Sequence, residues 1–170
     1  MNDQLQPAAQ AIRERFGAEL NEYAGDVWLT VSPDQIIEAC KTARDEYKFD
    51  LLTDLTPVDY WPQEEPRFHV VYNLFSSTEL ISLGLRVPLN RNAPHMPSIV
   101  PVYPGANWWE REAWDMFGIR FDGHPDMRRI LMPADWEGHP LRKDYPLGYE
   151  EVQFTFNVGD VEIRKPRPKD

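Results

Sequence analysis

The feature that most constrains the fold is an alternation of large apolar side chains with other residues in the segment 80–89. A repeat of two residues places every second side chain on the same face of an extended strand. The polar positions include Ser82, Gly84 and Arg86, and the apolar positions are Ile81, Leu83, Leu85, Val87 and Leu89. One face of this strand must therefore be covered, which requires a sheet with other elements packed against it.

Three further segments have the composition of strands. In residues 26–31 the side chains of Val27, Leu29 and Val31 fall on one side, as expected of a half-buried strand. The other two segments are residues 49–55 and 68–75. Together with the alternating segment they predict four strands within the first ninety residues.

Two helices are expected beside these strands. The first covers residues 7–16 and is closed by Gly17. The second begins with a capping pattern in which Ser32 is the N-cap and Pro33 the first helical residue. Its apolar stripe consists of Ile36, Cys40, Ala43 and Tyr47. The predicted fold class is α+β, with two helices packed on a mainly antiparallel four-stranded sheet.

A short third helix is expected over residues 107–117, with Asn107 as its N-cap and Gly118 at its end. Arg111 and Asp115 are four residues apart and are predicted to pair across one turn. The large apolar residues are spread over several faces: Trp108, Trp109, Ala113, Trp114, Met116 and Phe117. A helix with apolar residues on several faces must be covered on several sides. In a domain this small, we expect another protein to supply part of that cover.

The pattern changes after this helix. Prolines, apolar residues and paired charges follow one another without a helical or strand period. Such a segment has too little periodicity for a core and too many aromatic and aliphatic residues for a solvated tail. An extended arm that lies on a partner, with ion pairs fixing its position, explains both properties. The predicted division is an N-terminal helix and lead-in (residues 1–25), a core domain (26–118) and an extended partner-binding arm (119–170).

The composition argues against a self-contained enzyme. Cys40 is the only cysteine, which excludes a disulfide within the chain, an all-cysteine zinc site and an iron–sulfur cluster. The common nucleotide, zinc-protease and serine-hydrolase motifs are absent from the sequence. A net charge of −10 argues against a surface for nucleic acid or anionic membranes. No apolar run approaches the ~18 residues of a membrane span, and no leader pattern is present, so a cytoplasmic chain is expected.

Several motifs in the second half occur in a fixed order and spacing. They are Glu110-Arg111-Glu112, Asp115-Met116-Phe117-Gly118, the run from Gly123 to Ile130, and the run from Glu137 to Pro146. In these motifs the chain resembles the family of the 30-kDa subunit of respiratory complex I, the bacterial NADH–quinone oxidoreductase. Weaker matches at residues 54–60, 67–72 and 106–108 extend the resemblance over residues 27–149.

The resemblance implies a structural role inside a larger enzyme. The complex transfers electrons from NADH to quinone and pumps protons, and this chain is expected to be a non-catalytic subunit of its hydrophilic arm. It would brace the quinone-reducing module through contacts with the quinone-site subunit, close to the terminal-cluster subunit and other hydrophilic-arm subunits. FMN, iron–sulfur clusters and quinone would be held by partners, with no cofactor in this chain. The expected location is peripheral, on the cytoplasmic side of the cell membrane.

Charged and aromatic residues of the short helix and the arm form the predicted partner interface. Trp and Arg are enriched at interface hot spots. Arginines in the same stretch supply countercharge, so the carboxylates are expected to be ionised and paired, and not catalytic. Their ion pairs fix either a partner or the arm to the helix. The set is Trp108, Glu110, Arg111, Glu112, Trp114, Asp115, His124, Asp126, Arg128, Arg129, His139, Arg142, Lys143 and Asp144.

Two alternatives remain open at this point. The first keeps the scaffold role but places it in a membrane-bound hydrogenase or a ferredoxin- or deazaflavin-linked dehydrogenase, because the electron donor binds elsewhere. The second is a stand-alone metal-dependent hydrolase that uses His124, Asp126 and His139. The two histidines are 15 residues apart and lack an established ligand spacing, so the residues favour the scaffold.

Overall fold

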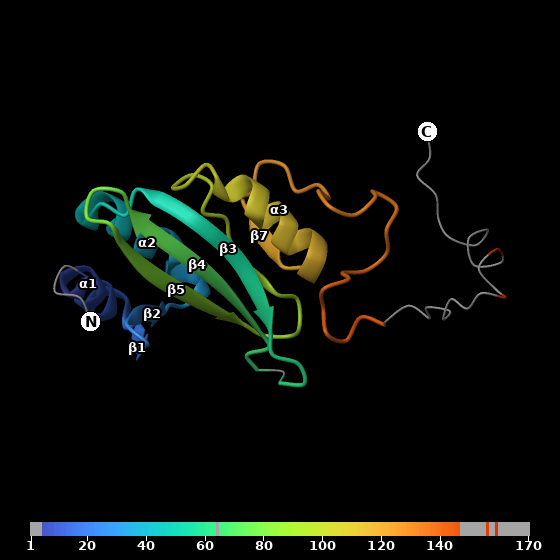
Figure 1. The fold of residues 1–170 in the computed structure, drawn as a ribbon, viewed down its shortest axis with the longest axis horizontal. Coiled ribbons are helices and arrows are strands. Elements are labelled where there is room, and N and C mark those ends of the chain that lie inside the picture. Colours follow the sequence, from blue (N-terminus) through green and yellow to red (C-terminus); the bar gives the residue numbers. More distant parts are fainter. Residues whose placement is uncertain (1–4, 64, 147–155, 157–158, 160–170) are drawn as a thin grey trace.

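The computed structural model describes residues 5–63 and 65–146, together with Phe156 and Gly159. Its helices are α1 (Gln6–Phe16), α2 (Ile36–Tyr47) and α3 (Ala106–Phe117), and a 3-10 turn, η1 (Pro33–Gln35), leads into α2. Its strands are β1 (Glu19–Tyr23), β2 (Asp26–Thr30), β3 (Leu51–Asp59), β4 (Phe68–Ser76), β5 (Ile81–Leu89), β6 (His95–Pro97) and β7 (Arg120–Asp122). The predicted α+β fold is confirmed (Figure 1).

The main sheet has one strand more than the sequence predicts. Its order is β1-β2-β5-β4-β3, and neighbours are antiparallel except β2 and β5, which run parallel. The additional strand is β1, which lies within the predicted lead-in. It joins β2 through a hairpin turn at Ala24 and Gly25, both with positive φ, a geometry that matches the twist of a hairpin. Because β1 leaves most of its side chains exposed, it carries no apolar alternation.

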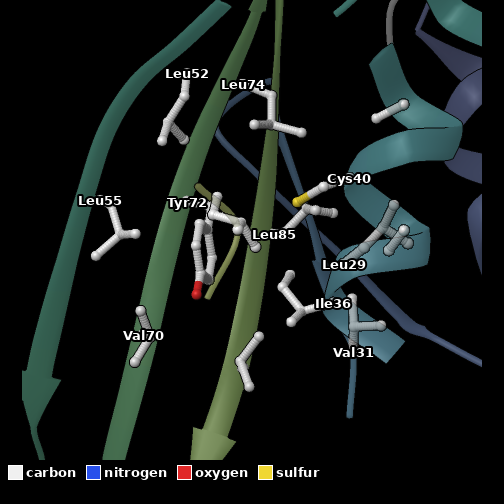
Figure 2. Packing of buried hydrophobic residues seen from close by; sticks show 14 of the residues in the cluster. Leu29, Val31, Ile36, Cys40, Leu52, Leu55, Val70, Tyr72, Leu74 and Leu85 are labelled. Atoms are coloured by element: carbon white, nitrogen blue, oxygen red, sulfur yellow. The ribbon is translucent and has the colours of Figure 1, made fainter. Parts of the chain in front are cut away.

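One face of the main sheet carries the core. In β4 the side chains of Phe68, Val70, Tyr72 and Leu74 are buried on this face. The alternating positions His69 and Asn73 are only half-buried. Figure 2 shows Ile36 and Cys40 of α2 lying against the β2 and β5 side chains on the covered face. The apolar stripe predicted for α2 therefore packs on the sheet, and the alternation predicted for residues 81–89 is confirmed.

Two helix starts differ from the sequence prediction. Pro33 begins the turn η1, so α2 proper starts at Ile36, and the hydroxyl of Ser32 donates to the side-chain oxygen of Gln35 over 2.8 Å. Asn107 is not the N-cap of α3, because the helix already includes Ala106. The N–H of Ala106 donates to the carbonyl of Tyr103 over 2.9 Å, so the preceding turn runs directly into the helix.

The predicted arm begins inside the fold and then follows α3. Its first residues form β7, which pairs in parallel with β6, and Met96 and Phe121 are buried opposite each other. From Asp122 to Pro146 every residue is at least partly exposed. In Figure 1 this stretch, drawn in orange, loops around α3. Residues 119–146 are hereafter called the arm, because all but two of residues 147–170 lie outside the described chain.

Candidate functional site

The arm closes the C-terminal end of α3. The last four carbonyls of an α-helix lack partners within the helix, and here they belong to residues 114–117. The first accepts from the N–H of Gly118 over 2.8 Å, and the second from Nδ1 of His139 over 2.9 Å. The third accepts from the N–H of Leu141 over 3.1 Å, and the fourth from Nε of Arg142. All four carbonyls are satisfied, three of them by the arm.

Gly118 is needed where the arm meets the helix. Its φ of 73° lies in the left-handed region that favours glycine. A Cβ at this position would lie 2.5 Å from the ring of His139 and 2.7 Å from Nη2 of Arg142. Backbone conformation and the close approach of the arm therefore both require glycine.

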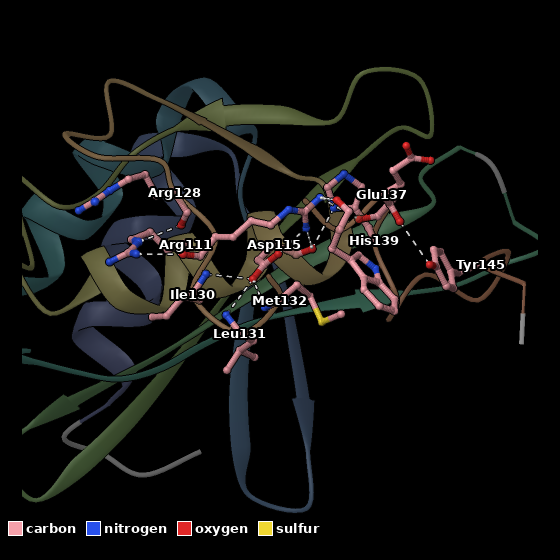
Figure 3. Close-up of polar contacts among 12 residues, drawn as sticks. Arg111, Asp115, Arg128, Ile130, Leu131, Met132, Glu137, His139 and Tyr145 are labelled. Carbon is pink, nitrogen blue, oxygen red and sulfur yellow. Dashed lines mark hydrogen bonds and ion pairs between the residues drawn. The ribbon is translucent and has the colours of Figure 1, made fainter. Parts of the chain in front are cut away.

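Asp115 fixes the middle of the arm. Its side chain is fully buried, and Oδ2 accepts from the N–H groups of Ile130, Leu131 and Met132 over 3.0, 2.9 and 2.9 Å. Oδ1 accepts from Nη1 of Arg129 over 2.5 Å. Burial alone would raise the pKa of Asp115, but these four donors hold it below its ordinary value. Figure 3 shows the arm backbone turned toward this carboxylate.

The predicted pairing of Arg111 with Asp115 is wrong, because Asp115 pairs with Arg129 instead. Arg111 donates from Nε to the carbonyl of Arg128 over 3.0 Å and from Nη2 to that of Arg129 over 3.2 Å. Its guanidinium also lies 5.3 Å from the ring centre of Trp108. Arg111 therefore binds the arm through its backbone, and the network fixes helix to arm, as one of the two interpretations of these charges predicts.

Arg129 extends the same network along the arm. Besides its ion pair, Nη2 donates to the carbonyls of Trp136 and Gly138 over 2.8 and 3.2 Å. The guanidinium lies 5.6 Å from the ring centre of Trp114. A single side chain thus links two arm turns to one face of α3.

The far end of the arm is anchored to the sheet by a buried ion-pair cluster. Arg67 is only 1% exposed, and it donates to Asp59 over 3.0 and 2.8 Å and to Asp144 over 2.9 and 2.7 Å. Asp59 also accepts from the N–H of Lys143 over 2.9 Å. Although burial opposes ionisation, these donors lower the pKa of Asp59 to about 2. Asp144, predicted to contact a partner, is paired within the chain.

Asp59 and Arg67 are absent from the predicted interface set. A signal for them exists in the sequence, because they flank the turn between two apolar strands. Asp59 pairs with Phe68, the residue after Arg67, in the β3–β4 register. An antiparallel hairpin therefore places the two charges together, and the match of both segments to the family pattern is consistent with this.

Glu110 departs from its prediction as an ionised interface residue. It is fully buried in the core, where Oε2 accepts from the hydroxyl of Ser98 over 2.6 Å and Oε1 from the N–H of Ile99 over 2.7 Å. Burial raises the pKa of Glu110 to about 7, while these two hydrogen bonds oppose the rise. The side chain therefore holds the segment before α3 in place, and its position inside the fold removes it from any partner surface.

The geometry also contradicts a metal site built on His124, Asp126 and His139. Nε2 of His124 donates to the carbonyl of Asn107 over 3.1 Å, and Nδ1 accepts from the N–H of Asp126 over 3.0 Å. His139 binds the carbonyl of Asp115, eight residues further along α3 and thus about 12 Å along the helix axis. The described residues contain no group of three potential ligands. Both histidines tie the arm to α3.

The other members of the predicted set lie on the outside of this network. Glu112 and Lys143 are exposed, and Trp114 is half-buried. Trp108 is 62% exposed. Arg128 is exposed and forms an ion pair with Asp126 over 2.6 Å. Together with the half-buried Arg111, these are the predicted residues whose side chains remain available to a partner.

Residues 29–151 match a protein family described as the 30-kDa subunit of respiratory-chain NADH dehydrogenase. The chain belongs to this family. The match includes all the motifs quoted above, the buried cluster of Arg67 and the whole arm. The resemblance seen in the sequence is thereby confirmed. The members of this family are subunits of an oxidoreductase complex.

Relatives within the 30-kDa family are named as the C subunit of NADH-quinone oxidoreductase. The protein of this name from Roseiflexus sp. (strain RS-1) is 49% identical over 88% of this chain and 86% of its own length. The one from Geobacter sulfurreducens is 42% identical over 80% of this chain and 86% of its own length.

Two solved structures have the same fold. A trypsin-resistant fragment of Nqo5 aligns with a TM-score of 0.64 and 29% identity, covering 72% of this chain and 98% of the fragment. A chain from a structure titled as the membrane-bound sulfane sulfur reductase, an archaeal respiratory membrane complex, aligns with a TM-score of 0.74 over 99% of this chain and 97% of that chain. At 22% identity the second likeness concerns the fold alone. Within the described residues, no helix is long and apolar enough to cross a membrane.

Proposed function

We propose that this chain is a cofactor-free structural subunit in the hydrophilic arm of a proton-pumping NADH–quinone oxidoreductase. It braces the quinone-reducing module by contacting the quinone-site subunit and the terminal-cluster subunit. FMN, iron–sulfur clusters and quinone belong to partner subunits, which carry out the catalysis. The chain is peripheral and lies on the cytoplasmic side of the cell membrane.

The observation that carries this proposal is the surface of α3 and the arm. Large apolar side chains remain exposed there: Trp108 by 62%, Leu131 by 60%, Leu141 by 54% and Trp136 by 40%. The backbone beneath them is held in place by Asp115, Arg129 and the capping of α3. A fixed backbone that presents exposed aromatic and aliphatic groups is typical of a surface that docks on another protein.

The use of the ionisable groups supports a non-catalytic role. Asp115 and Asp59 are occupied by arm donors, and Glu110 by the segment before α3. Cys40 is fully buried, and burial raises the pKa of its thiol, which disfavours the reactive thiolate. The side chains that could act as acids, bases or nucleophiles are thus either hydrogen-bonded within the fold or buried.

The test is an affinity purification of the tagged chain from gently solubilised native membranes, with partners identified by mass spectrometry. Recovery of the quinone-site subunit, the terminal-cluster subunit and an NADH-binding flavoprotein is expected. Recovery of a hydrogenase large subunit in place of the flavoprotein would mean that the chain has the same structural role in a different enzyme. Recovery of the chain alone under these conditions would overturn the proposal.

A further inference from the structure

An open groove lies between α3 and the arm. Its volume is about 500 Å³. Its walls combine arginines with apolar and aromatic side chains, chiefly Arg111, Trp114, Met127, Arg128, Arg129 and Met132. Figure 3 shows Arg111 and Arg128 reaching out at the same end of the polar network. The groove is therefore lined by basic and apolar side chains together.

The charge of this groove is opposite to that of the chain. The whole sequence carries −10, yet none of the described residues that line the groove is acidic. Asp115 offsets Arg129, and Asp126 offsets Arg128. Arg111 binds carbonyl oxygens and an aromatic ring, and it forms no ion pair with a described carboxylate. The carboxylate of Asp126 also attracts Arg111 at longer range, so the three guanidinium groups share two carboxylates, and a net positive charge remains beside an apolar wall.

We infer that the groove receives an acidic segment of a neighbouring subunit, in which a carboxylate side chain meets Arg111 and Arg128 and an adjacent apolar side chain lies against Met132. The inference rests on the function proposed above. Met side chains adapt to the shape of an incoming apolar group, and Arg binds carboxylates through paired donors. Trp108, exposed beside Arg111, extends the same surface.

Photo-crosslinking identifies the occupant. A benzoylphenylalanine is placed at Met132, inside the groove, and in a second chain at Tyr23, which is 82% exposed in the β1–β2 hairpin. Each tagged chain is assembled in cells that make the whole complex, irradiated and digested. The expected result is that the groove probe alone links to a partner segment containing Asp or Glu beside an apolar residue. A link to a neutral or basic segment, or to residues 147–170 of the same chain, overturns the inference.

A charge reversal measures how much the groove contributes. Arg128→Glu is compared with Arg120→Glu, a matched control, since each arginine pairs with an aspartate two residues away and their side chains are 75% and 76% exposed. Arg128→Glu is expected to lower the amount of co-purified partner by about tenfold or more, because like charges are then opposed. Replacement of the crosslinked Asp or Glu of the partner by Lys, combined with Arg128→Glu, is expected to restore assembly. Equal losses in both variants, or no rescue, contradict the inference.

These outcomes separate the inference from the function on which it rests. If the wild-type chain recovers no respiratory subunits, the proposed function fails. If the wild-type chain recovers them, but the groove probe stays unlinked in the assembled complex, the function stands and the groove inference fails.

Discussion

The sheet domain and the arm are stabilised by different forces. In residues 5–89 the buried groups are almost all apolar, and they form one cluster on the covered face of the sheet. From Asp122 to Pro146 every residue keeps some exposure, and the segment is held by hydrogen bonds and ion pairs to α3 and the sheet. Apolar burial is non-directional, whereas these contacts depend on single donors and acceptors. Core mutations should therefore act through volume, and arm mutations through individual polar groups.

The largest expected effect is at Arg67, where the two regions meet. Arg67→Met leaves the buried carboxylate of Asp59 without its cation, which costs about 3–5 kcal/mol. Because this cluster lies at the end of β3 and β4, the loss should lower the denaturant midpoint of the whole domain. Arg15→Met, which removes an exposed ion pair with Glu46, is the control. A normal midpoint with a released arm would show that the cluster belongs to the arm alone.

The next effect is a pH dependence of the core. The pKa of Glu110 is raised from its ordinary value of 4.5 to about 7 in the folded chain. Between these two pH values the folded state therefore keeps a proton that the unfolded state has released. The free energy of unfolding should fall by about 3 kcal/mol as pH rises from about 4.5 to about 7, and then level off.

Glu110→Gln should abolish this slope. Burial also lowers the pKa values of His69 and His139, which changes stability in the opposite direction, but both histidines are present in the two chains. The difference between wild type and variant therefore isolates Glu110. If the free energy of unfolding depends on pH in the same way in wild type and variant, the pKa of Glu110 is not raised by folding.

A smaller, local effect is expected at Asp115. Asp115→Asn removes the charge that receives Arg129 and places an amide against three backbone donors, a loss of about 1–3 kcal/mol. Hydrogen exchange should accelerate at the amides of residues 130–132 and remain unchanged in β4. Asp126→Asn, in an exposed pair, serves as the comparison. Equal acceleration in β4 would mean that arm and core unfold as one unit.

The smallest effect on the isolated chain is expected at the exposed arginine of the arm. Arg128→Ala should leave the denaturant midpoint nearly unchanged, because its ion pair is open to solvent. The same variant should reduce the amount of assembled complex recovered from membranes. Arg142→Ala, which also removes a cap from α3, should reduce assembly without abolishing folding. Wild-type assembly and activity in both variants would contradict the prediction that these arginines support assembly.

The elements that apolar periodicity determines could be predicted from the sequence. The alternation at residues 81–89 and the stripe on α2 correspond directly to buried faces. The strand β1 cannot be predicted in this way because its side chains are exposed, and the Ala24–Gly25 turn is its only local signal.

Within the site, the sequence predicts the residues of α3 and the arm, but not Asp59 and Arg67 on the sheet and not all of the pairings. Asp115 selects Arg129, 14 residues away, over Arg111 on its own helix. Three backbone donors of the arm converge on the same carboxylate, and no side-chain spacing encodes them. The prediction for Glu110 is wrong because its neighbour Arg111 binds the arm, whereas Glu110 itself is buried against Ser98 and Ile99.

The closing of α3 by the arm has a consequence for the order in which the chain folds during synthesis. The carbonyls of Met116 and Phe117 are bound by Leu141 and Arg142, and that of Asp115 by His139 in addition to Arg129. Residues 139–142 leave the ribosome more than twenty residues after the end of α3. Until then the helix ends in open acceptors. A nascent chain that stops short of His139 therefore lacks three of the groups that cap α3.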